Sequence, residues 1–357
     1  MRSVKILFTI VISLSALSTP FALFLSQEYN YEKDIVSVSR AYGDWFTVLL
    51  TDRLLRVNID GEVKRLRELF ENDVCYVSPL GKYYVVFNEV AGRLDLYSIE
   101  DDLPVYTSFA SDETYIVPDD GSYLIGYTMS DDASTKVHFY DSNGMIAKTM
   151  NYENFERVIV NLSNFILFDC GEDGYYIIDK DGYEVANLPS YPMVALMDSG
   201  QRFAFTDGDY VYFYEGEYLD YKYRVNVDEP LGMRYSTDGD CLAIWNREKI
   251  VNIDAVSYVE EWVHELRDQS LVVTDIAMTN QGESMFCGIV RDFGEEYSEE
   301  ERYSDPTLFM LDNRGYQRER ERIPVYHLLG QYPKLWCNND GSIVSVIFSR
   351  DFYIYKD

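Results

Sequence analysis

The stretch "YSTDGDCLAIW", residues 235–245, places a turn rich in Ser, Asp and Gly between an aromatic residue and an apolar run. Two other stretches have the same form, "YVSPLGKYYVVF" (76–87) and "IVPDDGSYLIGY" (116–127). Ser and Asp side chains bond to nearby backbone groups, and Gly adopts the positive φ that a tight hairpin needs. Each stretch therefore predicts a short turn that leads into a buried β-strand.

This pattern recurs along the whole chain. The turn residues of the eight occurrences are Gly43, Gly81, Gly121, Ser163, Gly200, Gly239, Gly282 and Gly341. A second β-rich run that ends in a polar turn follows each one, as in "YYIIDKDG" (175–182) and "LFMLDNRG" (308–315). A period near 40 residues, with about four short strands per unit, is typical of a β-propeller. We therefore expect an all-β fold.

The ends of the chain indicate how such a ring closes. The last unit, Lys334 to Asp357, holds about three strands, and the segment from Ser26 to Lys33 is expected to supply the fourth. Eight blades follow from the count. Seven would follow if the Ser163 unit or the last unit were not a true repeat. Residues 26–357 are thus expected to form one domain.

The interval between Gly282 and Gly341 is the longest, and it contains an acidic, polar segment, "RDFGEEYSEEERYSDP" (291–306). We expect a loop insertion there. Because long loops on rigid scaffolds often carry function, Tyr297, Tyr303 and Asp305 are the candidate partner-binding residues. The alternative is a solvated acidic loop without a binding role.

The stretch "YQRERERIPVY" (316–326) alternates arginine and glutamate. Such alternation suits an outer strand, because charges on a free edge oppose pairing with other chains. The alternative is a basic recognition ridge formed by Arg318, Arg320 and Arg322.

The N-terminus predicts export. Arg2 and Lys5 precede an uncharged stretch from Ile6 to Leu25, which is long enough as a helix to span a bilayer. Residues 1–25 are therefore expected to be an uncleaved signal anchor or a cleaved signal peptide, with a candidate cleavage site after Ser18. The remainder is expected outside the cytoplasm, at the cell surface or in the periplasm, in contact with the membrane through the N-terminal helix only.

Composition narrows the possible partners. With 31 basic and 61 acidic residues the formal net charge is −30, which argues against nucleic acid as a ligand and favours a soluble, monomeric ectodomain. The five cysteines lack metal-ligand spacing and read as buried free thiols. No motif assigns a catalytic, cofactor-binding or metal-ligating residue, and the carboxylates of "DCGEDG" (169–174) and "DKDG" (179–182) read as ordinary hairpin turns.

Three turns carry a resemblance to a known repeat class. Ser78-Pro79-Leu80-Gly81-Lys82, Pro118-Asp119-Asp120-Gly121 and Ser236-Thr237-Asp238-Gly239 resemble the "SPDGK" turn of bacterial WD40-like propellers of the TolB and YVTN type. The resemblance extends from Asp34 to the C-terminus and implies a repeat type rather than a function. Trp-Asp pairs at the blade ends are missing, so the sequence does not follow the eukaryotic WD40 pattern.

Three functions are compatible with these observations. The first is a non-enzymatic, exported propeller that binds another protein of the cell envelope as a scaffold. The second is a hydrolase or lyase that acts on a glycan or peptide through three or more carboxylates at the ring axis. The third is a small-ligand sensor module.

Overall fold

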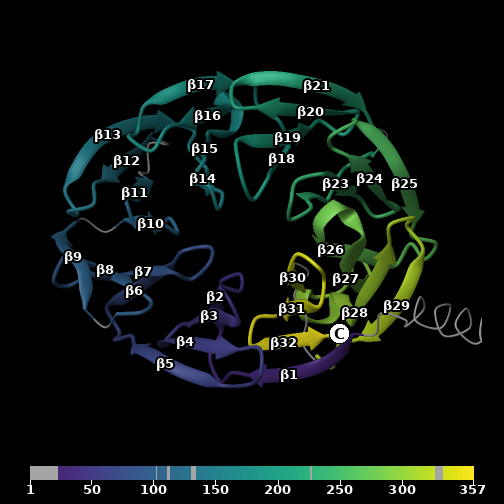
Figure 1. The fold of residues 1–357 in the computed structure, drawn as a ribbon, viewed down its shortest axis with the longest axis horizontal. Coiled ribbons are helices and arrows are strands. Elements are labelled where there is room, and N and C mark those ends of the chain that lie inside the picture. The colour runs from purple at the N-terminus through teal and green to yellow at the C-terminus, as the bar shows by residue number, and fades with distance from the viewer. Residues whose placement is uncertain (1–22, 102, 111–112, 130–133, 226, 326–332) are drawn as a thin grey trace, which may run out of the picture.

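The computed structural model describes residues 23–357 except 102, 111–112, 130–133, 226 and 326–332, and these residues form eight four-stranded antiparallel sheets, or blades, around a central opening (Figure 1). The eight-bladed all-β propeller expected from the repeat is therefore confirmed. The predicted N-terminal helix lies almost entirely outside the described residues.

From the axis outward, blades 1 to 4 contain these strands: β2 (Ile35–Val38), β3 (Trp45–Leu50), β4 (Arg53–Asn58) and β5 (Val63–Glu68); β6 (Asp73–Val77), β7 (Tyr83–Asn88), β8 (Arg93–Ser98) and β9 (Pro104–Phe109); β10 (Thr114–Ile116), β11 (Leu124–Met129), β12 (Ser134–Tyr140) and β13 (Ile146–Glu153); β14 (Arg157–Val160), β15 (Ile166–Asp169), β16 (Tyr175–Ile178) and β17 (Glu184–Leu188).

Blades 5 to 8 contain these strands: β18 (Met193–Leu196), β19 (Arg202–Thr206), β20 (Tyr210–Glu215) and β21 (Tyr218–Arg224); β22 (Gly232–Tyr235), β23 (Cys241–Trp245), β24 (Lys249–Asp254) and β25 (Val259–Glu265); β26 (Leu271–Met278), β27 (Ser284–Asp292), β28 (Tyr303–Asp312) and β29 (Gln317–Arg322); β30 (Lys334–Cys337), β31 (Ile343–Ile347), β32 (Asp351–Lys356) and β1 (Phe24–Asn30). The described residues also form three short helices, η1 (Gly171–Asp173), η2 (Asn280–Gly282) and α2 (Glu299–Arg302).

Strand β1 completes the eighth blade. It pairs antiparallel with β32 from Phe24↔Lys356 to Asn30↔Asp351, so the first and last strands of the propeller lie side by side (Figure 1). The strand begins two residues before the predicted segment, and Leu23 is already buried in the core between blades 7 and 8. A helix that continues to Leu25 is therefore wrong, because Leu23 to Leu25 are used by the propeller.

The repeated turn links neighbouring blades. Each turn joins the first and second strands of a blade, and we call the face that carries them the turn face. Asp119 Oδ1 accepts a hydrogen bond from Leu80 N in the preceding blade at 2.9 Å, and Asp238 Oδ2 accepts one from Gln281 N in the following blade at 2.7 Å. The repeated sequence therefore supplies both the hairpin and its contact with the next hairpin around the ring.

The fourth unit keeps this turn without glycine. Its left-handed residue is Asn164, with φ 59°, rather than Ser163, the position that the repeat alignment indicates. Asn tolerates this conformation better than other residues with a Cβ atom. The Ser163 hydroxyl instead accepts a hydrogen bond from Gly200 N in the fifth blade at 2.9 Å.

Apolar side chains between adjacent blades form the core. Phe165 of blade 4 stacks on Phe203 of blade 5 with ring centroids 5.5 Å apart, and both rings are buried. Burial of each such side chain contributes about 2–3 kcal/mol, which a blade can obtain only against a neighbour. All five cysteines are buried and free, as the sequence predicts.

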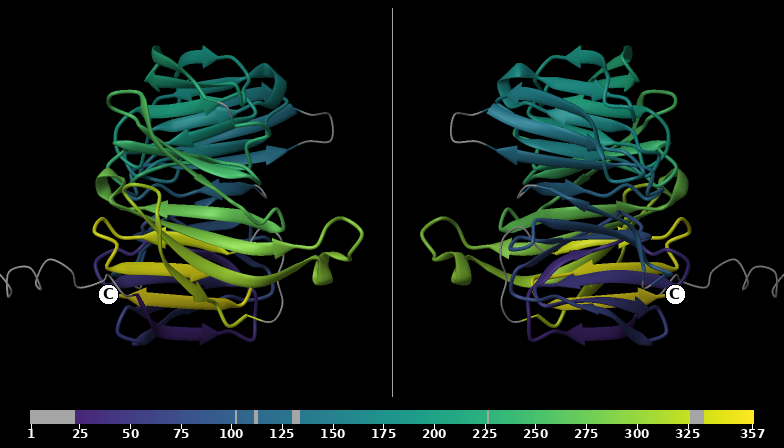
Figure 2. Two further views of the ribbon diagram at one scale, coloured as in Figure 1. Left: turned by 90° about the vertical axis from the view of Figure 1, so that its right-hand side faces the viewer. Right: turned by 90° about the vertical axis from the view of Figure 1, so that its left-hand side faces the viewer.

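The predicted bounds of the loop at 291–306 are wrong, because both ends of this segment belong to strands. Arg291 and Asp292 belong to β27, and Tyr303 to Pro306 belong to β28, so the insertion lengthens a hairpin that projects from the ring (Figure 2). The physical reason is that Arg291↔Ser304 and Asp292↔Tyr303 continue the β pairing past a bulge. A helix with the length and hydropathy of a membrane span is not found in the part of the chain that the structure describes.

Candidate interaction site

The hairpin of β27 and β28 is the feature that most clearly departs from the repeat. It leaves the ring on the face opposite the turn face, and its tip runs from Phe293 into α2 (Figure 2). We call residues 293–301 the hairpin tip.

A buried carboxylate fixes the base of the hairpin tip. Arg302 donates from Nε to Asp292 Oδ1 at 2.8 Å and from Nη2 to Oδ2 at 3.1 Å. Arg247, from the turn between β23 and β24 of the neighbouring blade, donates to Oδ2 at 2.9 Å. The hydrogen bond from Arg302 is the main reason that the pKa of Asp292 lies well below its ordinary value. Asp292 therefore joins both arms of the hairpin to blade 6.

The hairpin tip exposes aromatic and acidic side chains. The Phe293 and Tyr297 rings lie 5.7 Å apart, and 46% and 47% of these residues are exposed. Phe293 N donates to Arg302 O at 2.9 Å, and Tyr297 N donates to Gly294 O at 3.3 Å. The backbone N–H groups of both aromatic residues are therefore hydrogen-bonded. Glu295, Glu296 and Glu301 belong to the same segment and are also exposed. The tip thus combines an apolar centre with an acidic edge.

The three predicted partner-binding residues occupy different environments. Tyr297 lies in the hairpin tip, whereas Tyr303 is half-buried against the core between blades 7 and 8. Asp305 lies at the bulge of β28 with φ 51°. The structure thus brings only Tyr297 to the projecting end. Their role in binding a partner stays a prediction.

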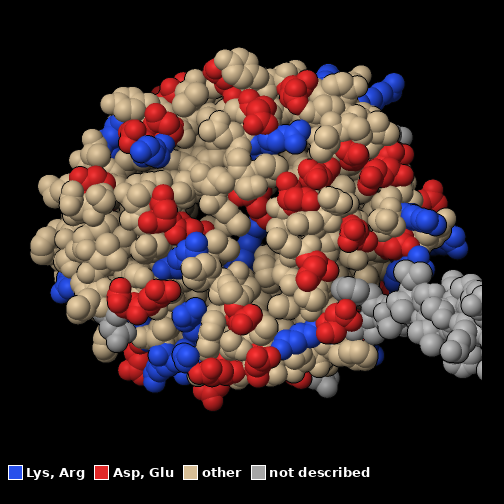
Figure 3. Space-filling view, viewed as in Figure 1, with Lys and Arg blue, Asp and Glu red and all other residues tan. Residues whose placement is uncertain are grey.

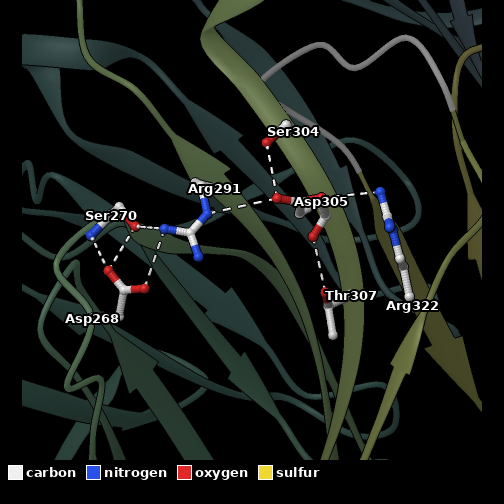
Figure 4. A network of polar contacts seen from close by, with 7 residues as sticks. All are labelled: Asp268, Ser270, Arg291, Ser304, Asp305, Thr307 and Arg322. Atoms are coloured by element: carbon white, nitrogen blue, oxygen red, sulfur yellow. Dashed lines mark hydrogen bonds and ion pairs between the residues drawn. The ribbon is translucent and has the colours of Figure 1, made fainter.

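Asp305 belongs to a network of charged residues beside the hairpin (Figure 4). Its carboxylate contacts Arg322 on β29 at 3.1 Å and Arg291 on β27 at 3.7 Å, and Arg291 also reaches Asp268 at 3.3 Å. Thr307 Oγ1 donates to Asp305 O at 2.9 Å. Because Pro306 has no N–H for the ladder, these contacts hold the bulge where regular pairing is interrupted.

Sequence reasoning missed Phe293, Arg302 and Arg247. Phe293 directly follows a long apolar strand, and its position just past the end of that strand was the available signal. Arg247 lies in a separate unit of the repeat, so only the packing of blade 6 on blade 7 brings it to Asp292.

The ring axis holds a second charged cluster. Arg40 of blade 1 forms an ion pair with Asp198 of blade 5, and Arg234 donates to Asp275 Oδ1 at 3.0 Å. These residues line a cavity of about 350 Å³ together with Ile159, Leu196 and Trp245. The described residues that line this cavity include two carboxylates, and each is paired with an arginine. The hydrolase hypothesis calls for three or more.

The carboxylates of the two acidic turns serve the local backbone. Asp179 Oδ1 accepts hydrogen bonds from Asp181 N at 3.0 Å and Tyr183 N at 2.7 Å, while Asp169 Oδ1 accepts one from Gly171 N at 3.2 Å. These bonds confirm that both stretches form hairpin turns. The described residues contain no cluster of His, Cys, Asp and Glu that fits a metal ion.

Comparison with solved structures supports the fold. The C-terminal WD40 domain of Sif2 matches 95% of this chain and 99% of its own, with a TM-score of 0.63 and 10% identity. A chain of the mitotic checkpoint complex matches 96% of this chain and 94% of its own (TM-score 0.50, 13% identity). Hsv2 of Kluyvelomyces marxianus matches 78% of this chain and 88% of its own, with a TM-score of 0.53 and 9% identity.

Comparison of the amino-acid sequence with known proteins identifies no relative. No family model and no curated protein matches the chain. The structural likeness therefore concerns the fold, and it includes WD40 domains although this sequence lacks their Trp-Asp pairs. The chain has the fold of an eight-bladed WD40 β-propeller.

Proposed function

We propose that the chain is a protein-binding scaffold in which the ring is a rigid support and the hairpin tip docks the partner. The observation that carries the proposal is the pair of half-exposed rings, Phe293 and Tyr297, on a base fixed by Asp292. Aromatic side chains on a rigid support bind with little loss of conformational entropy. The occurrence of a similar propeller in the mitotic checkpoint complex supports a role in a protein assembly.

The chemistry of the hairpin tip defines its partner. The two rings require an apolar recess, and the exposed Glu295, Glu296 and Glu301 require basic residues around it. Such charges at the edge of an interface accelerate association and orient the partner. We therefore propose a partner surface with an apolar recess and a basic rim.

The location of the termini orients this surface. Phe24 pairs with Lys356, and Asp357 N donates to Ser342 O, so the propeller begins and ends on the turn face. The hairpin tip projects from the opposite face (Figure 2). If residues 1–22 anchor the chain, the hairpin tip points away from the membrane.

Export to the cell envelope is part of the proposal. Its support is the sequence: Arg2 and Lys5, the apolar stretch and the acidic residues after it. The turns of the SPDG type support a bacterial repeat of the TolB and YVTN kind. The partner is then a protein of the envelope, and the body of the chain is a monomer outside the cytoplasm.

Photo-crosslinking tests the docking role. With p-benzoylphenylalanine at position 297 in the full chain, we expect a discrete crosslinked product that Phe293→Ser reduces. The matched control places the same group at Phe109, which is 78% exposed on blade 2. Equal products from positions 297 and 109, or none from position 297 in a well-folded chain, would contradict the docking role.

Export is tested separately with a fusion of alkaline phosphatase to Asp357. We expect activity, because this enzyme folds only outside the reducing cytoplasm. N-terminal sequencing then decides between an anchor and a peptide cut after Ser18. Phosphatase activity that stays absent while the fusion accumulates would overturn export and leave the docking role untouched.

A further inference from the structure

We propose that a groove on the rim between blades 6 and 7 binds an extended, acidic segment of a partner protein. The groove has a volume of about 620 Å³ and lies between β25 and the turn that joins β28 to β29. We call it the arginine groove, because Arg267, Arg314 and Arg320 all line it. It is distinct from the hairpin tip.

Both walls of the groove are fixed. His264 on β25 donates from Nδ1 to Gly315 O at 2.8 Å, which ties blade 6 to the turn of blade 7. Within that turn, Asp312 Oδ1 accepts hydrogen bonds from Arg314 N and Tyr316 N, each at 2.9 Å. The backbone that presents Arg314 is therefore held in place while its side chain is exposed.

The three arginines lack acidic partners. The neighbouring Arg318 and Arg322 on β29 are paired with Asp312 and Asp305. By contrast, Arg267, Arg314 and Arg320 have no carboxylate at ion-pair distance among the residues that the structure describes. Two carboxylates, Glu265 and Asp268, also line the groove, and Asp268 is paired with Arg291. In a chain with 61 acidic and 31 basic residues, three unpaired arginines therefore leave this lining with a net positive charge. Figure 3 shows Lys and Arg side chains at the rim between β25 and β29, with Asp and Glu side chains beside them.

The groove also offers apolar surface. The Arg320 guanidinium lies 5.1 Å from the centre of the buried Phe309 ring, and the exposed side chains of Val263 and Tyr316 line the groove. Guanidinium groups bind carboxylates through two parallel hydrogen bonds, and these bonds are strongest where apolar neighbours exclude water. Carboxylates that alternate with apolar side chains on an extended chain fit both features.

The negative charge of the rest of the chain argues against nucleic acid as the occupant of the groove. A polyanion with a charge at every nucleotide would meet the field of a chain with net charge −30 outside the groove. A short acidic protein segment places its charges in the groove alone. The occupant we propose is therefore a segment rich in Glu or Asp, with at least one apolar side chain.

Fluorescence anisotropy with a labelled oligo-glutamate peptide tests this inference on the full chain. We expect binding that weakens as salt is added, and at least about tenfold weaker binding in the triple variant R267A/R314A/R320A. The control triple variant R53A/R65A/R350A removes the same charge from arginines that are already paired elsewhere on the ring. It should bind the peptide within about twofold of the wild type.

Every other outcome overturns the proposal. An equal loss in both triple variants would show non-specific attraction, and absence of binding at low salt would show that the groove is not an acidic-segment site. Binding to phosphatidylserine vesicles but not to oligo-glutamate would assign the groove to lipid. Self-association that R267A/R314A/R320A abolishes would assign it to a second copy. Because Arg314 lies on an exposed turn, the single variant R314A keeps the test valid if the triple variant unfolds.

Discussion

Arg40 in the first blade forms an ion pair with Asp198 in the fifth blade, on opposite sides of the ring (Figure 1). The pair therefore crosses the central opening and joins two blades that share no strand pairing. Its side chains are 27% and 20% exposed, which leaves the pair only partly screened by water.

We expect Arg40→Ala and Asp198→Ala each to lower the free energy of unfolding by about 1–2 kcal/mol, with the double variant little worse than either single one. Each single change leaves the other charge unpaired near the axis, and the double change does not. Urea denaturation of all four proteins gives the coupling energy. A coupling energy of zero would show that the pair contributes nothing.

Asp292→Asn should loosen the hairpin tip. Arg302 and Arg247 would lose a charged acceptor, which we expect to cost about 1–3 kcal/mol at neutral pH and to accelerate hydrogen exchange at Phe293 N. Asp305→Asn is the control, because its side chain is 46% exposed and should cost less than about 1 kcal/mol. Equal effects of the two changes would argue against Asp292 as the anchor.

Acid should remove the contribution of Asp292. Hydrogen bonds from arginine lower the pKa of this carboxyl in the folded state, so its contribution to stability is complete above the ordinary carboxyl pKa of about 4. That contribution is lost as the pH falls through the lowered pKa. The stability difference between wild type and Asp292→Asn should therefore shrink below about pH 4. A difference that grows with acid would reverse the assigned sign.

Gly126→Ala should destabilise blade 3 by about 2 kcal/mol or more. A Cβ atom at Gly126 would overlap with Glu113 Oε2, and the Glu113 carboxylate also contacts His138 and Tyr140. Gly43→Ala is the matched control, since its added Cβ meets nothing within 4 Å and carries only the cost of a φ of 61°. We expect about 1 kcal/mol there. Thermal unfolding of both variants separates lack of space from backbone conformation.

The five cysteine thiols should not react in the native protein. Burial raises the pKa of Cys75, Cys170, Cys241 and Cys337 to about 12. We expect no reaction with a disulfide reagent at pH 8 and five reactive thiols after denaturation without reductant. Fewer than five would reveal a disulfide in the protein as isolated.

Much of the fold could be predicted because hairpin chemistry is local. The Gly turn, the apolar run and the second polar turn all lie within one unit, so periodicity alone indicated eight blades. The sequence also indicated that "YQRERER" is an outer strand, which β29 confirms. The Asn164 turn was misaligned by one residue, because Ser and Asn both suit a turn and only the backbone φ distinguishes them.

The candidate sites were less predictable, because they depend on contacts between units. Arg318 and Arg322 pair with acids because of where Asp312 and Asp305 lie after folding, whereas Arg320 has no carboxylate partner among the described residues. Likewise Asp292 accepts a hydrogen bond from Arg247 of blade 6, which lies more than forty residues away in the chain. No spacing rule within one repeat encodes such distant partners.

The pairing of β1 with β32 has a consequence for the newly made chain. Among the strands of the propeller, β1 leaves the ribosome first and β32 leaves it last. At about 5–20 residues per second the first strand waits for roughly tens of seconds without its partner. Until β32 has been synthesised, β1 is therefore an unpaired edge, and the eighth blade is complete only after that.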